Sequence, residues 1–309
     1  MDNANLNPNI QGYLNHCQYE KCLDTKTLKA YKIDLEQFDV YIKNTGGNYN
    51  KESIQAYIAS LYGSYSVKSV KRKIASVKAF FNYLEFEELI EINPFSKIRV
   101  KLHEPYLLPR TIPLTTINKL LRCAYQQLYT QNISTYQYRA NLRDIAVLEL
   151  LFATGMRISE LCTLHAVDVN LLEGIIKIYG KGSKERLIQI SNYDVLTALK
   201  KYYQAFSNEI ECTGWFFINR LSHRMSDQSV RIMIKNYCKI AGINQHITPH
   251  MFRHSFATLL LEEDVDIRYI QQLLGHSSIV TTQIYTHVTS KKQRDILAAK
   301  HPRNKISTQ

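Results

Sequence analysis

The sequence has little glycine, no low-complexity segment and no internal repeat. Only 11 of its 309 residues are glycine, whereas 21 are tyrosine and 45% are hydrophobic. This composition is that of an ordinary globular protein. A chain of this length can bury a substantial core, and the length predicts two domains rather than one.

Cysteine pairs and long apolar runs are also missing. The six cysteines include no C-x-x-C pair and no spacing typical of a disulfide framework, which indicates reduced and mostly buried thiols. The first ten residues, MDNANLNPNI, lack the basic and apolar regions of a signal peptide. The longest apolar runs, such as residues 145–153, contain a charge and are too short to cross a bilayer. We therefore expect a soluble, cytoplasmic protein with no membrane partner.

Acidic residues are in deficit. The chain carries 39 lysines and arginines against 27 aspartates and glutamates, which gives a formal net charge of +12. Such a balance favours a polyanionic partner, because each phosphate that a cation neutralises releases counterions. A merely basic globular protein has the same net charge, so charge alone leaves nucleic-acid binding open.

One segment has no acidic residue at all. Between residues 53 and 84 there are five basic side chains and no acidic one. The apolar spacing predicts a helix over residues 67–84, with the cations largely on the face opposite the apolar one. A solvated face usually mixes both signs of charge, so we interpret these cations as phosphate contacts. The residues concerned are Lys68, Lys71, Arg72 and Lys78.

The first third of the chain is predicted to be helical. Apolar spacing and cap residues predict helices over residues 26–44, 52–61 and 67–84. Together they would form an N-terminal helical DNA-binding domain, residues 1–95.

A proline-rich stretch separates this domain from the remainder of the chain. Four prolines between residues 93 and 113 indicate an extended linker, residues 96–112. The C-terminal domain, residues 113–309, is predicted to be mainly helical with one β-hairpin. The first elements expected in it are helices at 114–128 and 138–153 and strands at 175–179 and 186–190. The expected fold class is therefore mainly α with a small antiparallel sheet.

Two short segments of the C-terminal domain carry candidate functional residues. The segment A-T-G-M-R-I-S-E-L places Arg157 and Glu160 just after a helix-ending glycine, although an arginine at a helix start is usually a surface residue. The turn G-K-G-S-K-E-R holds Lys181 between glycines, which let the backbone turn sharply and the lysine reach a ligand. It does not match a phosphate-binding Walker A loop, because glycine follows the lysine. By itself, this turn would be interpreted as an exposed cationic loop.

A third segment, T-P-H-M-F-R-H, has the pattern of a helix start. With Thr248 as N-cap and Pro249 at the first helical position, His250 and Arg253 fall on nearly the same face. His254 follows His250 at a spacing that zinc sites use. There is no glutamate after the first histidine and no evident third ligand, so we expect a structural role for His254 and no metal.

The last two segments, L-G-H-S and T-T-Q-I-Y-T-H-V, contain His276 and Tyr285. Taken together, the five segments supply what transfer of a phosphodiester needs. Arginines can stabilise the charge on the non-bridging oxygens, and a tyrosine hydroxyl can attack and later leave. His250 can assist the attack and Lys181 can protonate the departing 5′-oxygen. With this much fixed positive charge, a metal ion is unnecessary.

In this order and at about this spacing, the segments closely resemble those of the tyrosine recombinase, or phage integrase, family, and within it the Xer-like bacterial members. The resemblance covers nearly everything from residue 10 to residue 300. It implies that Tyr285 is the nucleophile and that Glu160 supports the first arginine. The activating residues that it implies are Arg157, Lys181, His250, Arg253 and His276. Lys184 and Arg186, near Lys181, are expected to contact DNA.

The resemblance also implies a function. Two domains would form a C-shaped clamp around double-stranded DNA that carries a specific recombination site. Four protomers would assemble on two such sites and exchange strands through a four-way junction, each with a 3′-phosphotyrosyl link and no cofactor. The resemblance also implies a bacterial cytoplasmic protein that is associated with the nucleoid when it is bound to DNA. A helper protein, the target sequence and the biological role (chromosome-dimer resolution, plasmid resolution or integration of a mobile element) are left open.

Two other functions remain as alternatives. A type IB topoisomerase-like enzyme would use the same chemistry to nick and close DNA without pairing two sites. A catalytically silent DNA-binding protein would be expected to lack at least one of the six active residues, and none is missing here.

Overall fold

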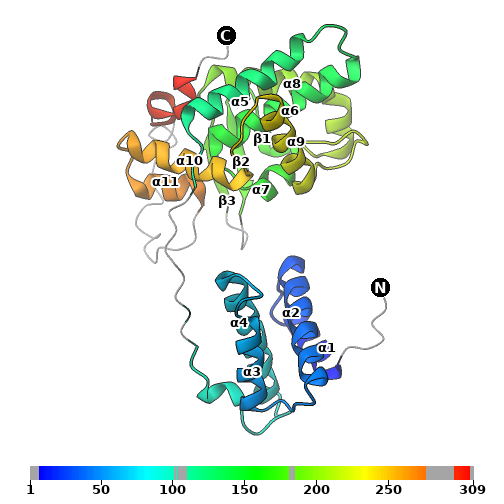
Figure 1. Ribbon diagram of the computed structural model, residues 1–309. Helices are drawn as coiled ribbons and strands as arrows, with labels where there is room; N and C mark the ends of the chain where they lie inside the picture. Colours follow the sequence, from blue (N-terminus) through cyan, green and yellow to red (C-terminus); the bar gives the residue numbers. More distant parts are fainter. Residues whose placement is uncertain (1–6, 101, 103–109, 181–184, 276–295, 307–309) are drawn as a thin grey trace. The chain divides into compact units, whose positions relative to one another are not determined.

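The computed structural model describes residues 7–100, 102, 110–180, 185–275 and 296–306. The chain divides into two compact units, residues 1–107 and 108–309, which are described separately (Figure 1). The division falls within the stretch 96–112 for which a linker is predicted.

Unit 1 is a helical bundle. Its described elements are α1 (Pro8–Tyr19), α2 (Thr25–Asn44), α3 (Lys51–Leu61), α4 (Val67–Phe86) and the 3-10 helix η1 (Pro94–Lys97). The three predicted helices are confirmed, and α1 is an addition that the sequence pattern did not predict. Side chains cap the helix starts: Asp24 accepts a hydrogen bond from the Thr27 amide, and Asn50 accepts one from the Ser53 amide, both at 2.9 Å.

Apolar packing and one buried carboxylate hold α2 against α4. Phe38 of α2 meets Phe81 of α4 edge to face, with ring centroids 6.0 Å apart. Nearby, the fully buried Asp34 accepts hydrogen bonds from Lys73 at 3.1 Å and from the Ser76 hydroxyl at 3.0 Å, and it also pairs with Arg72. A buried charge is tolerated only when it is paired and hydrogen-bonded, so this contact fixes the register of the two helices.

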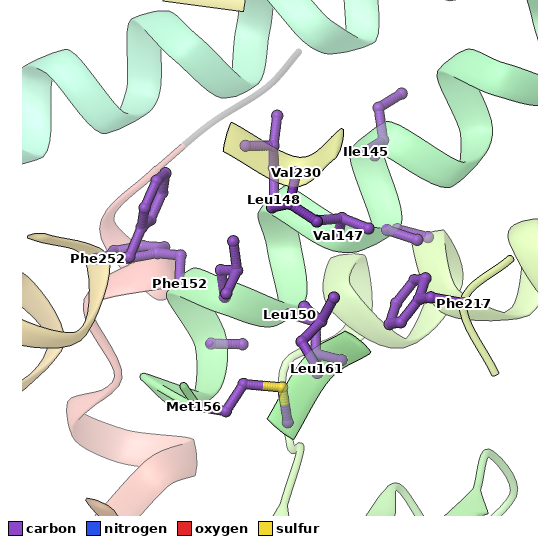
Figure 2. Packing of buried hydrophobic residues seen from close by; sticks show 14 of the residues in the cluster. Ile145, Val147, Leu148, Leu150, Phe152, Met156, Leu161, Phe217, Val230 and Phe252 are labelled. Carbon is purple, nitrogen blue, oxygen red and sulfur yellow. The ribbon is translucent and has the colours of Figure 1, made fainter. Parts of the chain in front are cut away.

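Unit 2 is built around one buried helix, α6 (Thr135–Thr154). Every residue from 144 to 154 is buried, as expected of a helix covered on all sides. Figure 2 shows Phe252 and Phe217 packing near opposite sides of this helix. The elements around it are α5 (Leu114–Gln126), η2 (Gln127–Tyr129), α7 (Ile158–Cys162), η3 (Ala166–Asp168), α8 (Tyr193–Thr213), α9 (Asp227–Ile240), α10 (Pro249–Glu262), α11 (Ile267–Leu274) and η4 (Pro302–Lys305).

A small antiparallel sheet completes the described part of unit 2. Its order is β1 (Val169–Asn170), β2 (Ile175–Tyr179) and β3 (Glu185–Gln189). The predicted hairpin is confirmed, with Ile176 opposite Ile188 and Ile178 opposite Arg186. Alternate residues face the core, as the pleat requires. The predicted fold class, mainly α with a small antiparallel sheet, is confirmed.

Residues 301–306 fasten the end of the chain to α6. Arg303 and Glu149, both with fully buried side chains, form a two-pronged ion pair with N–O distances of 2.7 Å. The Tyr125 hydroxyl donates to the same carboxylate at 2.9 Å. His301 contacts the carbonyl of Ala153 at 2.7 Å, and burial lowers its pKa to about 4, so its ring is neutral at pH 7. The C-terminal part of α6 is thereby held at Glu149 and at Ala153.

Two expectations from composition can be compared with the structure. All six cysteines are free and four of them are buried. No helix in the described ranges is both long enough and apolar enough to span a membrane.

Replacing Arg303 with alanine should strongly destabilise unit 2. The substitution leaves the carboxylate of Glu149 buried without its partner, which typically costs about 3–5 kcal/mol. Denaturant unfolding followed by circular dichroism would measure the loss. Lys305→Ala is the matched control, because it breaks a more exposed ion pair with Glu263 in the same segment and should change the midpoint little. Equal effects of the two substitutions would contradict this account of the segment.

Candidate active site

A sharp turn between α6 and α7 positions Arg157. Gly155 ends α6 in the left-handed conformation, with φ of +58°, and a Cβ there would lie 2.7 Å from the ring of Phe256. Arg157 is the N-cap of α7, and its amide donates to Glu160 at 2.8 Å. Glycine is thus required at the turn, and the backbone of Arg157 is fixed by a carboxylate three residues further along the chain.

Glu160 binds two arginines. Its side chain is only 5% exposed. Oε1 accepts from Arg157 Nη1 at 2.8 Å, and the guanidinium of Arg186 donates to both oxygens, at 3.0 and 2.6 Å. Burial opposes ionisation of this carboxyl, but the hydrogen bonds and charge of Arg186 and the hydrogen bonds from Arg157 outweigh it and lower the pKa of Glu160 below its ordinary value. The carboxylate therefore stays charged at neutral pH.

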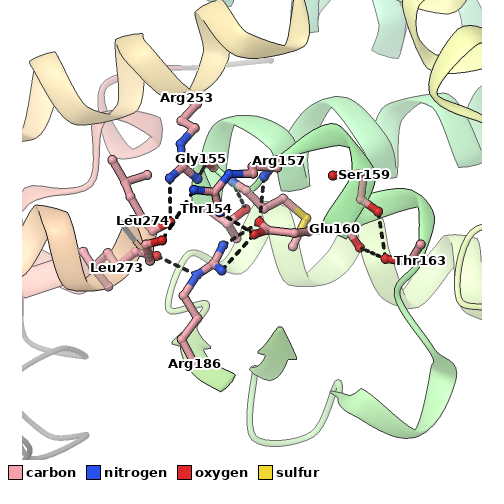
Figure 3. Close-up of polar contacts among 12 residues, drawn as sticks. Thr154, Gly155, Arg157, Ser159, Glu160, Thr163, Arg186, Arg253, Leu273 and Leu274 are labelled. Atoms are coloured by element: carbon pink, nitrogen blue, oxygen red, sulfur yellow. Dashed lines mark hydrogen bonds and ion pairs between the residues drawn. The ribbon is translucent and has the colours of Figure 1, made fainter. Parts of the chain in front are cut away.

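Three guanidinium groups bind to the backbone at the end of α11, as Figure 3 shows. Arg186 Nε donates to the carbonyl of Leu273 at 2.9 Å, and Arg253 Nη2 donates to that of Leu274 at 2.5 Å. Arg157 Nη2 contacts the carbonyl of Gly275 at 3.4 Å. The last carbonyls of a helix lack intrahelical partners and carry partial negative charge, so they attract cations. These carbonyls bring together arginines from three separate parts of the sequence.

Arg253 is the most enclosed of these arginines. It is 6% exposed, and its Nη1 also donates to the carbonyl of Gly155 at 3.0 Å. Burial and the neighbouring charge of Arg157 lower the pKa of Arg253 to about 10, so it remains charged at pH 7. It links α10 to both the α6–α7 turn and the end of α11.

His250 lies one turn before Arg253 on α10. The helix begins as predicted, with Thr248 as N-cap and Pro249 in the first turn. His250 is exposed, but partial burial of its ring and the positive charges around it, first among them Arg231 of α9, lower its pKa below the ordinary value. A neutral imidazole next to fixed cations can accept a proton at pH 7. Arg231 is a nearby cation that the motifs did not predict.

Several predicted residues lie outside the described ranges: Lys181, Lys184, His276 and Tyr285. Of the predicted active residues, the structure therefore brings together Arg157, His250 and Arg253, with Glu160 beside them. His254 is exposed, and no three His, Cys, Asp or Glu residues within the described ranges are placed to hold a metal ion.

Arg186 lies elsewhere than expected for a DNA contact. Its side chain is only 10% exposed and points inward to Glu160. Strand alternation is the signal that could have found this position: Arg186 shares a face with Ile188, which is a core residue, and lies opposite the buried Ile178. The structure places this cation within the site rather than on the surface around it.

The cations predicted on α4 of unit 1 are exposed, whereas Val70, Ile74 and Val77 on the same helix are buried. Lys68, Lys71 and Lys78 lie on the surface. Arg72 is exposed too, and it also pairs with the buried Asp34. A basic face therefore runs along this helix, although one of its members also holds the bundle together.

Comparison with known proteins assigns the family. Residues 123–292 match the model of the phage integrase family, and residues 10–88 match its N-terminal SAM-like domain. A tyrosine recombinase of Agathobacter rectalis is 53% identical, over 97% of this chain and 98% of that protein. The tyrosine recombinase XerC of Thermodesulfovibrio yellowstonii is 36% identical, over 96% and 97%. The chain belongs to the phage integrase family of tyrosine recombinases.

Members of this family cleave and rejoin DNA through a tyrosine intermediate, and this chain is a site-specific recombinase of that type. Solved structures share the fold. XerH bound to a palindromic difH substrate matches with a TM-score of 0.70 at 20% identity, covering 94% of this chain and 83% of that one. A lambda integrase dimer bound to a COC′ core site matches with a TM-score of 0.64 at 17% identity, covering 87% and 94%.

The pH dependence of cleavage should show the lowered pKa of His250. Only the neutral ring can accept a proton, so the rate should be level around neutrality and fall only below about pH 6.5, the ordinary histidine value. Single-turnover cleavage measured from pH 5 to pH 8 tests this.

His250→Gln is the matched variant. It should cleave more slowly, on the order of 10²-fold, and its rate should lack the acidic fall. An acidic fall that persists unchanged in His250→Gln would assign the titration to another group.

Proposed function

We propose that Tyr285 is the nucleophile of this recombinase and that Arg157 and Arg253 hold the phosphate it attacks. The observation that carries this proposal is the cationic centre at the end of α11, where both guanidinium groups are anchored to backbone carbonyls. His276 follows the last of these carbonyls directly in the sequence, and Tyr285 lies nine residues beyond it.

The anchoring contacts leave hydrogen-bond donors for a phosphate. A guanidinium has five N–H groups. The contacts described for Arg157 use two of its side-chain N–H groups, one to Glu160 and one to Gly275. Those of Arg253 also use two, to Gly155 and Leu274. Both side chains are held in place before substrate binds, and this is what makes electrostatic stabilisation of a transition state effective.

The chemical step follows from these positions. The Tyr285 oxygen attacks phosphorus, its proton passes towards the neutral His250, and the bond to the 5′-oxygen breaks. Lys181 protonates that oxygen, which leaves a 3′-phosphotyrosyl link and a free 5′-hydroxyl. His276 donates to the phosphate alongside the two arginines. Because a phenol leaves readily, the reverse attack by a 5′-hydroxyl rejoins a strand without any external energy source.

The proposed partner is double-stranded DNA with a specific recombination site. The basic face of α4, formed by Lys68, Lys71, Arg72 and Lys78, would contact its backbone, and Lys184 would do so near the site. We propose a homotetramer on two sites, with strand exchange through a four-way junction. Two structures with the same fold support this: XerH bound to its difH substrate, and a lambda integrase tetramer bound to a Holliday junction.

Tyr285→Phe should bind DNA nearly as well as the unmodified chain but form no covalent complex, because only the attacking hydroxyl is lost. The test is a nicked suicide substrate that traps the covalent complex, followed by mass spectrometry of the attached peptide.

Tyr269→Phe is the matched control, since Tyr269 lies in α11, outside the predicted motifs, and its replacement should leave trapping intact. A complex that forms equally well with Tyr285→Phe, or that maps to another tyrosine, ends the assignment.

A further inference from the structure

Arg186 makes three hydrogen bonds with two partners, and neither partner is a surface group. Two bonds go to the oxygens of Glu160 and one goes to the carbonyl of Leu273. The side chain thus joins β3 to α7 and to the last turn of α11. Only the forked guanidinium can make this set of bonds, because a lysine ammonium is a point donor on a flexible stem.

The charges in this cluster have to be counted together. Glu160 accepts two bonds from Arg157 and two from Arg186, which fills the roughly four acceptor positions of a carboxylate. Arg157, Arg186 and Glu160 together carry one net positive charge. Without Arg186, the charge of Glu160 would be balanced by Arg157 alone, and the cluster would be neutral.

We propose that Arg186 is a positioning residue for DNA cleavage, which compensates Glu160 so that the charge of Arg157 remains available to the phosphate. Its bond to Leu273 also sets α11, and with it the carbonyls on which Arg157 and Arg253 rest. Arg186 does not touch DNA in this role and acts through its neighbours. The proposal rests on the proposed function, in which Arg157 holds the phosphate.

The decisive experiment first replaces Arg186 and then also replaces Glu160, whose negative charge Arg186 compensates. Arg186→Ala should slow single-turnover cleavage of the suicide substrate by about 10- to 100-fold, somewhat less than the loss of a direct donor costs. DNA affinity and its salt dependence should stay unchanged. Adding Glu160→Gln to this variant restores one net positive charge at Arg157. The double variant should therefore cleave faster than Arg186→Ala, although more slowly than the unmodified chain.

Faster cleavage after the addition of Glu160→Gln distinguishes the positioning role from two simpler roles, a direct phosphate contact and a purely structural residue. A direct phosphate contact would weaken binding and lower the salt slope by about one unit, with no rescue by Glu160→Gln. A purely structural residue would lower the melting temperature, and cleavage by the single and double variants would rise and fall with that temperature. Arg143→Ala is the matched control, because it removes a similarly covered arginine from Asp144 on α6. It should lower the melting temperature and leave cleavage unchanged.

Arg186→Gln carries the same test if the alanine variant does not fold, because it is neutral but keeps a polar group near Leu273. A double variant that cleaves no faster than the single one overturns the proposal, and so does a defect confined to binding. The proposed function is judged separately on the unmodified chain. If the unmodified chain attaches DNA to Tyr285 but the Arg186 variants cleave at its rate, only this inference fails.

Discussion

The carbonyl groups at the end of α11 are the contact on which the site depends. Arg157 precedes α7, Arg186 lies in β3 and Arg253 lies in α10, and their positive charges repel one another. They are held together because each donates to one of three successive carbonyls, where the helix carries partial negative charge, and because Glu160 lies between two of them. The site is therefore assembled by backbone acceptors as much as by side chains, and it concentrates positive charge in one place.

Buried carboxylates paired with cations, as at Glu160, also occur elsewhere in the fold. Buried carboxylates hold cations in both units: Asp34 pairs with Lys73 and Arg72 between α2 and α4, and Glu149 pairs with Arg303 against α6. Each carboxylate joins segments that are distant in sequence. Removing its cationic partner would strongly destabilise the fold, because the carboxylate would be left buried and unpaired. With Glu160 of the site, three of the acidic residues of this basic chain thus lie inside the fold, each paired with a cation. Exposed cations such as Lys68, Lys71 and Lys78 lie on the surface, where a polyanion can reach them.

Local patterns could be predicted from the sequence because local physics decides them. The helix over 67–84, the hairpin and the start of α10 at Thr248 follow from apolar spacing, turn glycines and capping. Helix α1 escaped prediction because its pattern is weak and Gly12 interrupts it. The partners of Arg186 could not be predicted, since they come from residues 26 and 87 positions away. The strand alternation does indicate that this side chain points inward, but a turn rich in cations favoured the interpretation as a DNA contact.

The most direct test of the account is a crystal structure of the recombinase on its DNA site with vanadate in place of the scissile phosphate. Vanadate adopts the five-coordinate geometry of the transition state and shows which groups hold the non-bridging oxygens. We expect vanadium bonded to Tyr285, with equatorial oxygens about 2.7–3.1 Å from nitrogens of Arg157 and Arg253, and with Arg186 still bridging Glu160 and Leu273. Vanadium bonded to another residue, or equatorial oxygens held by cations other than these two arginines, would contradict it.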